Sequence, residues 1–309
     1  SLMLRSGEDD WDVRRGIIGP FQFVGDEVPF ASVSIDRGGR VVIAAASSGR
    51  RIEVYALDGP GRPLEQLSTL GDGGGEGISV APKLFYKEDG GFLLCATQPL
   101  TVEGGDEGIT TESLGITYSV SRTGEDWTDF KRLVSDPNLS YVYLPSYAAY
   151  NGRDYVVFQA SPSESRYYQL FMVSSTDGGN SWGRPRRLTT FKDSLGLDDA
   201  DVNNYDNQRP YISGAQNGIH LVWERRFATT TPPQIYYGLL NSEGNFVRDA
   251  ERVTSGNNNC RSPQVIVDGD APYVLWFDDR KGENRIFLGY RQGISWQDSD
   301  LSIMPGSSM

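Results

Sequence analysis

The sequence repeats one pattern five times, and this repeat limits the possible folds more than any other feature. Each copy has a proline, an apolar run, a short polar turn and a second apolar run. The copies begin 53, 63, 65 and 53 residues apart, at Pro29, Pro82, Pro145, Pro210 and Pro263. Gly, Asn and Asp dominate the turns, as is typical of hairpins. Because proline is tolerated at the start of a strand, we interpret each copy as two antiparallel strands.

Two further strands are predicted after each hairpin. The third-strand candidates are residues 51–57, 115–121, 168–174, 234–240 and 285–290. A turn with glycine, and in three copies tryptophan, then leads to a fourth strand. Four strands per unit at this period, without helical periodicity, are typical of a β-propeller. The sequence predicts an all-β protein, a β-propeller of four-stranded antiparallel blades, with five blades favoured and six as the alternative.

The repeat also suggests the domain boundaries. Residues 1–13 are interpreted as an N-terminal tail or cloning remnant, 14–304 as a single propeller domain, and 305–309 as a C-terminal tail. One additional strand is predicted at residues 17–24, before the first proline. We expect it to complete the last blade as an outer strand, because closing the ring removes exposed strand edges.

Composition excludes several classes of function. The formal charge of −12 repels phosphate backbones, so no nucleic-acid partner is expected. No run of 18 apolar residues occurs, so no transmembrane segment is expected. No Cys/His metal spacing is present, and Asp199-x-Asp201-x-Asn203 lacks the later glycine and glutamate of a calcium loop. We therefore expect no metal and no cofactor. The only histidine, His220, lies inside a predicted strand.

One turn carries a family motif. Ser-Thr-Asp-Gly-Gly-Asn-Ser-Trp follows an apolar run and ends at Trp182. This stretch resembles the Asp-box, Ser/Thr-x-Asp-x-Gly-x-Ser/Thr-Trp, of the bacterial-neuraminidase-repeat family of sialidase-like propellers. It matches at Ser175, Asp177, Gly179, Ser181 and Trp182. The resemblance implies a turn on the blade rim, remote from an active centre, so we interpret Asp177 as a folding device.

The loops at one mouth of a propeller are the expected ligand site. Arginine and carboxylate residues concentrate there in the fourth and fifth repeats. A bidentate arginine suits a carboxylate, sulfate or phosphate group. The predicted ligand-binding residues are Tyr143, Asp206, Arg209, Arg225, Arg261 and Arg280. Ion pairing of Arg209 with Glu224, and of Arg261 with Asp279, is the alternative role for two of these arginines.

Glu224 and Asp279 are weak candidates for a catalytic pair, since two carboxylates can divide acid and base roles in a glycosidase. The sequence departs from the catalytic patterns of the families it resembles. Residues 26–29 read Asp-Glu-Val-Pro, without the arginine that sialidases place before the first proline. None of the residues before the five prolines is acidic, whereas five-bladed furanosidases have a carboxylate there.

Two functional hypotheses follow. The favoured one is an extracellular or periplasmic, non-catalytic recognition or sensor module for a glycan or other acidic, hydroxyl-rich ligand. The alternative is a sialidase-like glycoside hydrolase with carboxylates at the mouth. Whether the chain is an enzyme is left open, with the missing arginine favouring the first hypothesis. A protein-docking scaffold is a third class, and fusion to other domains is also left open.

Overall fold

The computed structural model describes residues 2–5, 11–14, 31–47, 51–59, 61–71, 81–103, 110–165, 167–189, 205–227 and 231–302. For residues 2–5, 11–14, 100–103 and 110–112 it describes the backbone alone. The chain divides into two compact units, Ser1–Ser135 and Asp136–Met309, and each is described by itself. None of the described residues forms a helix long and apolar enough to cross a membrane.

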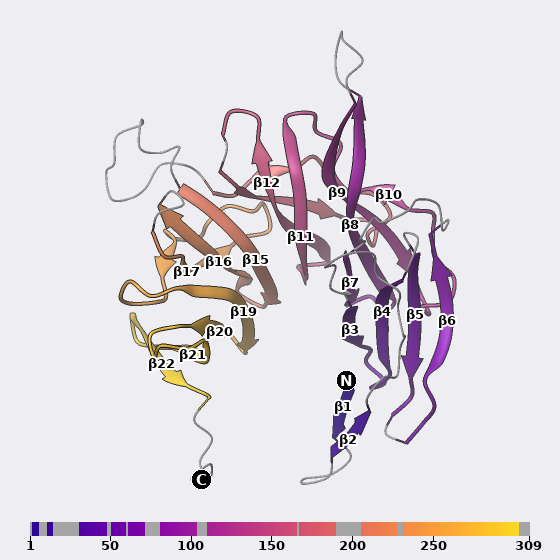
Figure 1. The fold of residues 1–309 in the computed structure, drawn as a ribbon, viewed down its shortest axis with the longest axis horizontal. Helices are drawn as coiled ribbons and strands as arrows, with labels where there is room; N and C mark the ends of the chain where they lie inside the picture. The colour runs from indigo at the N-terminus through magenta and orange to yellow at the C-terminus, as the bar shows by residue number, and fades with distance from the viewer. Residues whose placement is uncertain are drawn as a thin grey trace. The chain divides into compact units, whose positions relative to one another are not determined.

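The first unit contains two four-stranded antiparallel sheets and one separate hairpin (Figure 1). In the hairpin, β1 (Leu2–Arg5) pairs with β2 (Trp11–Arg14). The first sheet has β3 (Ala31–Ile35), β4 (Val41–Ser47), β5 (Arg51–Leu57) and β6 (Glu65–Leu70). The second has β7 (Ala81–Tyr86), β8 (Phe92–Glu103), β9 (Thr110–Ser121) and β10 (Lys131–Arg132). Pairing of β8 with β9 continues to Glu103 and Thr110, so this hairpin extends past the other strands of its sheet.

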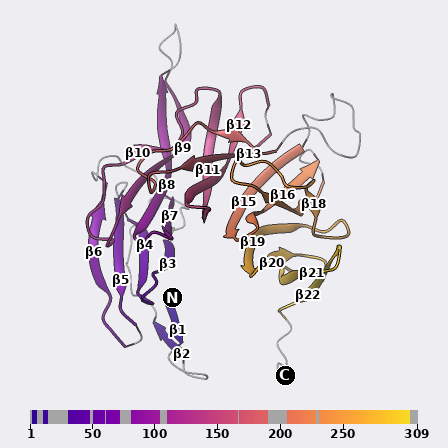
Figure 2. The same cartoon turned by 180° about the vertical axis from the view of Figure 1, so that it is seen from behind.

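The second unit contains three sheets of the same kind (Figure 2). The third sheet has β11 (Leu139–Tyr150), β12 (Arg153–Pro162), β13 (Gln169–Ser175) and β14 (Arg186–Arg187). The fourth has β15 (Tyr205–Ala215), β16 (Gly218–Phe227), β17 (Gln234–Leu240) and β18 (Glu251–Arg252). The fifth has β19 (Cys260–Asp268), β20 (Ala271–Asp278), β21 (Arg285–Gln292) and β22 (Ser295–Asp300).

Each sheet is one predicted repeat, with its four strands paired in chain order. The prediction of an all-β chain with four-stranded antiparallel blades is confirmed, and the described residues form five such sheets. We number these sheets as blades 1 to 5. Blade 5 receives its fourth strand from β22, and the strand predicted at residues 17–24 lies outside the described residues. The predicted domain boundaries stay a prediction.

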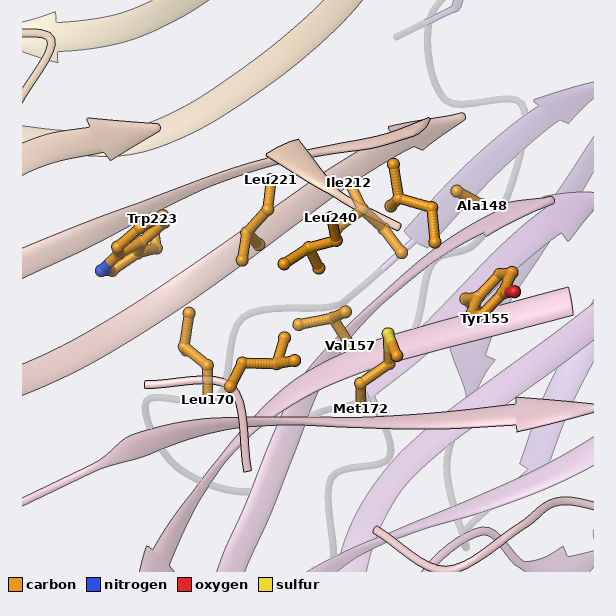
Figure 3. Packing of buried hydrophobic residues seen from close by; sticks show 11 residues of the cluster. Ala148, Tyr155, Val157, Leu170, Met172, Ile212, Leu221, Trp223 and Leu240 are labelled. Carbon is orange, nitrogen blue, oxygen red and sulfur yellow. The ribbon is translucent and has the colours of Figure 1, made fainter. Parts of the chain in front are cut away.

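Within each unit the core lies between neighbouring sheets, because the second strands of blades 1 to 4 are largely buried on both faces. In β12, residues from Asp154 to Ala160 are all buried. One cluster joins blade 3 to blade 4, with Val157, Leu170 and Met172 facing Leu221 and Trp223 across the gap between the sheets (Figure 3). Burial of a side chain of this size contributes about 1.5–3 kcal/mol. Strands buried on both sides therefore fix the blades as stacked layers.

The Asp-box stretch forms the turn between the third and fourth strands of blade 3, as predicted. The Asp177 carboxylate accepts hydrogen bonds from the Ser181 amide at 2.9 Å and the Ser175 hydroxyl at 2.7 Å. The Ser175 hydroxyl in turn accepts the Gly179 amide at 2.9 Å. Gly178 and Gly179 have φ of 70° and 81°, a conformation that glycine adopts without steric cost. The turn is thus stabilised by its own side chains.

Candidate functional site

Three first strands in the second unit share a β-bulge at the proline, which lies inside each strand and not at its start as predicted. The pairing register shifts between Tyr143 and Ser146 in β11, between Gln208 and Tyr211 in β15, and between Arg261 and Gln264 in β19. The residue directly before each proline has a positive φ. We call these the bulge residues: Leu144 at 56°, Arg209 at 49° and Ser262 at 54°.

A positive φ is unfavourable for residues other than glycine, and such strain concentrates at functional sites. Here it recurs at equivalent positions of three blades, so it belongs to the repeat. The strands β11 and β15 contact each other, as do β15 and β19. The three bulges therefore form one row across neighbouring strands.

Buried side chains of the preceding blade hold two of the bulge residues in place. Gln159 Oε1 accepts the Arg209 amide at 2.7 Å, and Glu224 Oε1 accepts the Ser262 amide at 2.6 Å. Gln159 and Glu224 occupy equivalent positions, since they pair with Tyr143 and Gln208 directly before each bulge. We call them the connectors. Both connectors are buried, whereas Arg209 is half-buried and Ser262 is exposed, so it is the acceptor end of each bond that is shielded from water.

Glu224 has a second partner on its own blade. Its Oε2 accepts a hydrogen bond from Arg209 Nη1 at 2.8 Å, which confirms the predicted ion pair. The Glu224 side chain is 5% exposed, whereas that of Arg209 is 42% exposed. Among the described residues, Nη1 is the only guanidinium nitrogen of Arg209 in a hydrogen bond. The other guanidinium nitrogens have no hydrogen-bond partner among the described residues, on a side chain that is nearly half exposed.

Arg261 and Asp279 do not form the other predicted pair among the described residues. Asp279 instead accepts the Asn259 amide at 2.9 Å through one oxygen and the Asn259 side chain at 2.6 Å through the other. Arg261 is exposed, and no hydrogen bond or ion pair within the described chain engages its guanidinium. Within this site it is the arginine with an uncommitted charge.

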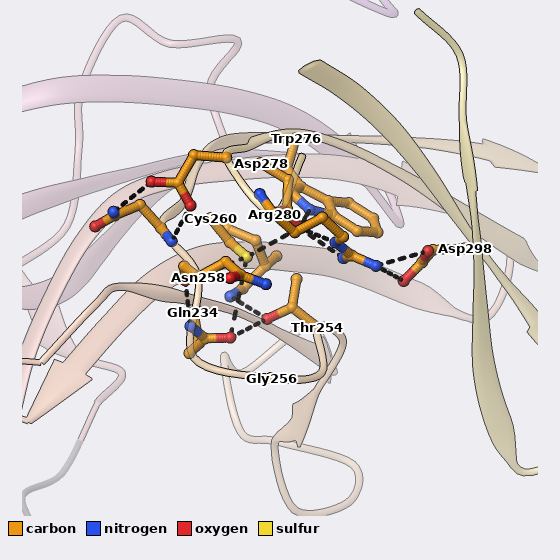
Figure 4. Close-up of polar contacts among 12 residues, drawn as sticks. Gln234, Thr254, Gly256, Asn258, Cys260, Trp276, Asp278, Arg280 and Asp298 are labelled. Atoms are coloured by element: carbon orange, nitrogen blue, oxygen red, sulfur yellow. Dashed lines mark hydrogen bonds and ion pairs between the residues drawn. The ribbon is translucent and has the colours of Figure 1, made fainter. Parts of the chain in front are cut away.

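Arg280 forms ion pairs with two carboxylates of its own blade, blade 5 (Figure 4). It donates to Asp278 at 2.6 Å and to Asp298 at 3.0 Å, and its guanidinium lies 4.3 Å from the centre of the Phe287 ring. Burial alone would raise the pKa of Asp278, but the hydrogen bonds from Arg280 hold it below its ordinary value. Burial and the nearby Asp278 carboxylate raise the pKa of Cys260 to about 12, so this thiol is protonated.

Two further predicted residues have partners of their own. Asp206 Oδ2 accepts hydrogen bonds from Arg226 Nε at 2.9 Å and from Arg226 Nη2 at 2.8 Å. Asp206 Oδ1 accepts a hydrogen bond from the Tyr168 amide at 3.0 Å. The Arg225 guanidinium stacks 4.1 Å above the centre of the Tyr205 ring. These contacts fix the ends of β15 and β16. The predicted ligand-binding roles of Asp206, Arg225 and Arg280 stay predictions.

Tyr143 lies beside the connector of blade 3. Its ring packs edge to face on Tyr168, with centroids 5.5 Å apart. Burial, and then a hydrogen bond with Tyr168, raise the pKa of Tyr143 well above its ordinary value. Arg209 lowers this pKa by a smaller amount. The Tyr143 hydroxyl is therefore protonated and lies close enough to Arg209 to interact with it electrostatically.

The structure thus brings together Tyr143, Arg209 and Glu224 of the predicted set, with Arg261 on the next bulge. The sequence places Gln159 among the residues expected at the mouth, but it predicts no role for this side chain, which lies in an apolar strand. Sequence reasoning missed Asn241, whose Oδ1 accepts the Asn245 amide at 2.9 Å in the blade 4 turn. Like the hydrogen bond from the Ser181 amide to Asp177, this bond joins residues four positions apart in the sequence. No cluster of three or more metal-ligating side chains occurs within the described chain.

Comparison with known proteins places the fold. No family model matches the chain, so the resemblance to the Asp-box family stays a prediction. No curated protein matches it either. Among solved structures, it is similar to an α-L-arabinanase of Penicillium chrysogenum complexed with arabinobiose. The two share 16% identity at a TM-score of 0.62, over 89% of this chain and 82% of the arabinanase.

Two other structures are similar to the chain. One is the GH93 α-L-arabinofuranosidase of Fusarium graminearum with arabinobiose, with 15% identity and a TM-score of 0.62 over 90% of this chain and 82% of that one. The other is a PL25 ulvan lyase bound to -[GlcA(1-4)Rha3S]-, with 11% identity and a TM-score of 0.55 over 85% of this chain and 69% of that one. At these identities the similarity shows the fold alone, a β-propeller, and the described residues form five of its four-stranded blades.

Proposed function

We propose that the chain is a non-catalytic recognition module that binds an acidic, hydroxyl-rich glycan at the row of bulges on β11, β15 and β19. One observation carries the proposal. Both candidate catalytic carboxylates are committed to structural hydrogen bonds, while the guanidinium of Arg261 is exposed and uncommitted. A recognition site needs exposed donors, whereas a general acid or base must reach the substrate.

Every oxygen of the two carboxylates accepts at least one hydrogen bond from the protein. One oxygen of Glu224 accepts from Arg209 and the other from Ser262. Both oxygens of Asp279 accept from Asn259. A glycosidase pair has one carboxylic acid directed at the leaving oxygen and one carboxylate directed at water or the sugar. Either residue would have to do this with an oxygen that already accepts a structural hydrogen bond.

The charge of the site defines the ligand class. Glu224 neutralises Arg209, so Arg261 supplies the excess positive charge. A uronate or sulfate group suits an arginine fork, and the half-exposed donors of Arg209 suit the neighbouring hydroxyl groups. The saccharides named in the similar structures support the choice of a glycan. Arabinobiose is neutral, and -[GlcA(1-4)Rha3S]- carries both a uronate and a sulfate.

The proposal is tested by isothermal titration of a glucuronate-containing oligosaccharide, a sulfated oligosaccharide and neutral arabinobiose. We expect the acidic members to bind and arabinobiose to bind at least tenfold more weakly. Arg261→Ala should weaken the acidic members by about tenfold, the loss of one exposed charge-assisted contact. Arg184→Ala removes an exposed arginine beyond the Asp-box turn and should change nothing. Equal binding of arabinobiose, or unchanged binding by Arg261→Ala, would refute the proposal.

A glycoside hydrolase is the second candidate, favoured by the buried position of Glu224 beside Arg209 in the mouth. It predicts slow turnover of an aryl arabinofuranoside or aryl sialoside over hours. That turnover should disappear in Glu224→Gln, because an amide keeps the shape of the side chain without its proton chemistry. Such a result would replace the recognition module with an enzyme.

A further inference from the structure

The two connectors and two bulge residues form one continuous chain of hydrogen bonds across three blades. Gln159 Oε1 of blade 3 accepts the Arg209 amide of blade 4 at 2.7 Å. Arg209 Nη1 donates to Glu224 Oε2 at 2.8 Å. Glu224 Oε1 then accepts the Ser262 amide of blade 5 at 2.6 Å. We infer that Gln159 and Glu224 are positioning residues, which set the ligand-binding arginines through the backbone of the following blade.

The physical reason lies in the strain of the bulges. At a bulge the amide leaves the regular ladder, and an amide left without a partner destabilises the fold. A positive φ at Arg209 or Ser262 is unfavourable as well. The connector offsets both costs with one bond, and it can do so only while the bulge residue keeps its strained conformation. Each connector therefore selects one backbone conformation for the residue it holds.

The backbone conformation that each connector selects also sets the direction of a ligand-binding side chain. Gln159 holds the backbone of Arg209 itself. Glu224 holds the amide of Ser262, which directly follows Arg261 in β19. The direction in which Arg261 leaves the strand thus depends on a carboxylate of the neighbouring blade. The hydrogen bonds of Gln159 and Glu224 are part of the protein itself. Their effect on the affinity for a glycan rests on the proposed glycan-binding function.

Comparison of the repeats separates the two tasks of Glu224. In blade 3 the bulge residue is the apolar Leu144, and the connector is the neutral Gln159. In blade 4 the bulge residue is Arg209, and the connector is the anionic Glu224. The side-chain oxygen of Gln159 is sufficient to hold the next blade. The second oxygen of Glu224 is therefore needed only for Arg209, and the two tasks can be removed separately.

Glu224→Gln should remove the ion pair with Arg209 and keep the bond to the Ser262 amide. Glu224→Met should remove both contacts. The glutamine keeps an oxygen for the Ser262 amide and places its amide NH2 group against Arg209, which releases the guanidinium. The methionine fills a similar volume without any acceptor. Hydrogen exchange of the Ser262 amide and the affinity for a glucuronate-containing oligosaccharide are measured for both. Glu283→Gln is the matched control, because Glu283 also pairs with an arginine, Arg285, outside this chain of bonds.

We expect Glu224→Gln to leave Ser262 exchange within about threefold of the native rate and to bind the oligosaccharide more tightly than Glu224→Met does. Glu224→Met should raise Ser262 exchange and weaken binding, each by about tenfold, the factor that 1.4 kcal/mol represents. If Ser262 exchange is the same in Glu224→Met and the native protein, the positioning role is wrong. It is also wrong if both variants weaken binding equally, since charge alone would then account for the loss.

Failure of the proposed function gives a different result. A native protein that binds no acidic oligosaccharide, yet shows the expected exchange at Ser262, refutes the ligand and supports the positioning contacts. Should Glu224→Met not fold, Gln159→Met provides the same test at the equivalent position. Its expected result is about tenfold faster exchange at the Arg209 amide. Unchanged exchange there would overturn the inference.

Discussion

Gly214 in β15 lies so close to Ala149 in β11 that a Cβ atom at position 214 would stand 1.9 Å from the Ala149 carbonyl oxygen. No side chain fits at that distance, so blades 3 and 4 can stack as they do only with glycine at this point. The contact lies farther along the same two strands that carry the bulges of Leu144 and Arg209. It therefore helps to set the spacing of the candidate site.

Gly214→Ala is expected to destabilise the protein by about 3 kcal/mol or more, because one of the two backbones must move. Gly152→Ala is the matched control. Gly152 has a φ of 69° and nothing within 4 Å of an added Cβ, so it should lose only about 1–2 kcal/mol of conformational energy. The midpoints of urea unfolding measure both. Equal losses in the two variants would show that the close approach is relieved at little cost.

The Asp177 carboxylate gives the second prediction. Asp177→Ala should cost about 1–2 kcal/mol, because the hydroxyl and amide of Ser181 and the hydroxyl of Ser175 lose their acceptor. Asp177→Asn keeps one acceptor oxygen and should cost less. Affinity for the ligand should be unchanged in both variants, since the turn lies at the outer strands of blade 3. Loss of binding at unchanged stability would contradict the structural role of the turn.

The same turn should respond to acid. Hydrogen bonds from the side chain and amide of Ser181, followed by that from Ser175, lower the pKa of Asp177 from 3.8 to about 2. The folded state therefore favours the charged carboxylate. Its contribution is complete above about pH 4 and declines as the pH falls toward 2. The difference in unfolding midpoint between the native protein and Asp177→Asn should shrink across that interval.

His220 gives a fourth prediction, at a milder pH. Its Nδ1 lies 2.9 Å from the Tyr237 hydroxyl and its Nε2 lies 2.8 Å from Asn217 Oδ1. Burial, and to a smaller degree Arg248, lower the pKa of His220 from 6.5 to about 4, while Asp270 acts in the opposite direction. Between about pH 4 and pH 6.5, His220 thus binds a proton in the unfolded chain but not in the folded chain.

Stability should consequently fall as the pH drops from about 6.5 to about 4, at no more than roughly 1.4 kcal/mol per pH unit. The comparison is between the native protein and His220→Gln, unfolded in urea at several pH values. Because this is the only histidine of the chain, the difference between the two curves isolates its effect. Parallel curves from pH 7 to pH 4 would mean that His220 titrates alike in both states.

The sequence predicts the blades well because strand pairing is local. Proline, the alternation of apolar residues and the Gly or Asn turns are all contained within each repeat, so each hairpin is visible without reference to its neighbours. The third strands were also found within a few residues of their observed bounds. The fourth strands of blades 2, 3 and 4 are only two residues long, too short to leave a periodic pattern.

The site is harder to predict, because its contacts join residues of different blades. Opposite charges at Arg209 and Glu224 indicated a pair that the structure confirms. The same reasoning paired Arg261 with Asp279, but Asn259 offers Asp279 two donors from a position nearer in space. The bond from the Arg209 amide to Gln159 has no charge and spans 50 residues. Only the stacking of the blades reveals it.

The arrangement at Arg209 should be transferable to blade 3, and this gives the final prediction. Gln159 is fully buried and its Nε2 has no hydrogen-bond partner among the described residues. Gln159→Glu would replace that nitrogen with an oxygen, and Leu144→Arg would place a guanidinium at the equivalent bulge. Each single variant should be destabilised, the first by a buried unpaired carboxylate and the second by lost packing.

The double variant should recover part of the loss, with a coupling energy of about 1–3 kcal/mol in a double-mutant cycle of urea unfolding. Leu144→Met combined with Gln159→Glu is the control, since it changes the packing without supplying a partner. Its effects should add. Additive losses in the arginine double variant as well would mean that Arg209 and Glu224 owe their contact to features peculiar to blade 4. A recovery confined to the arginine variant would show that the bulge and connector geometry of the repeat is itself sufficient to build the pair.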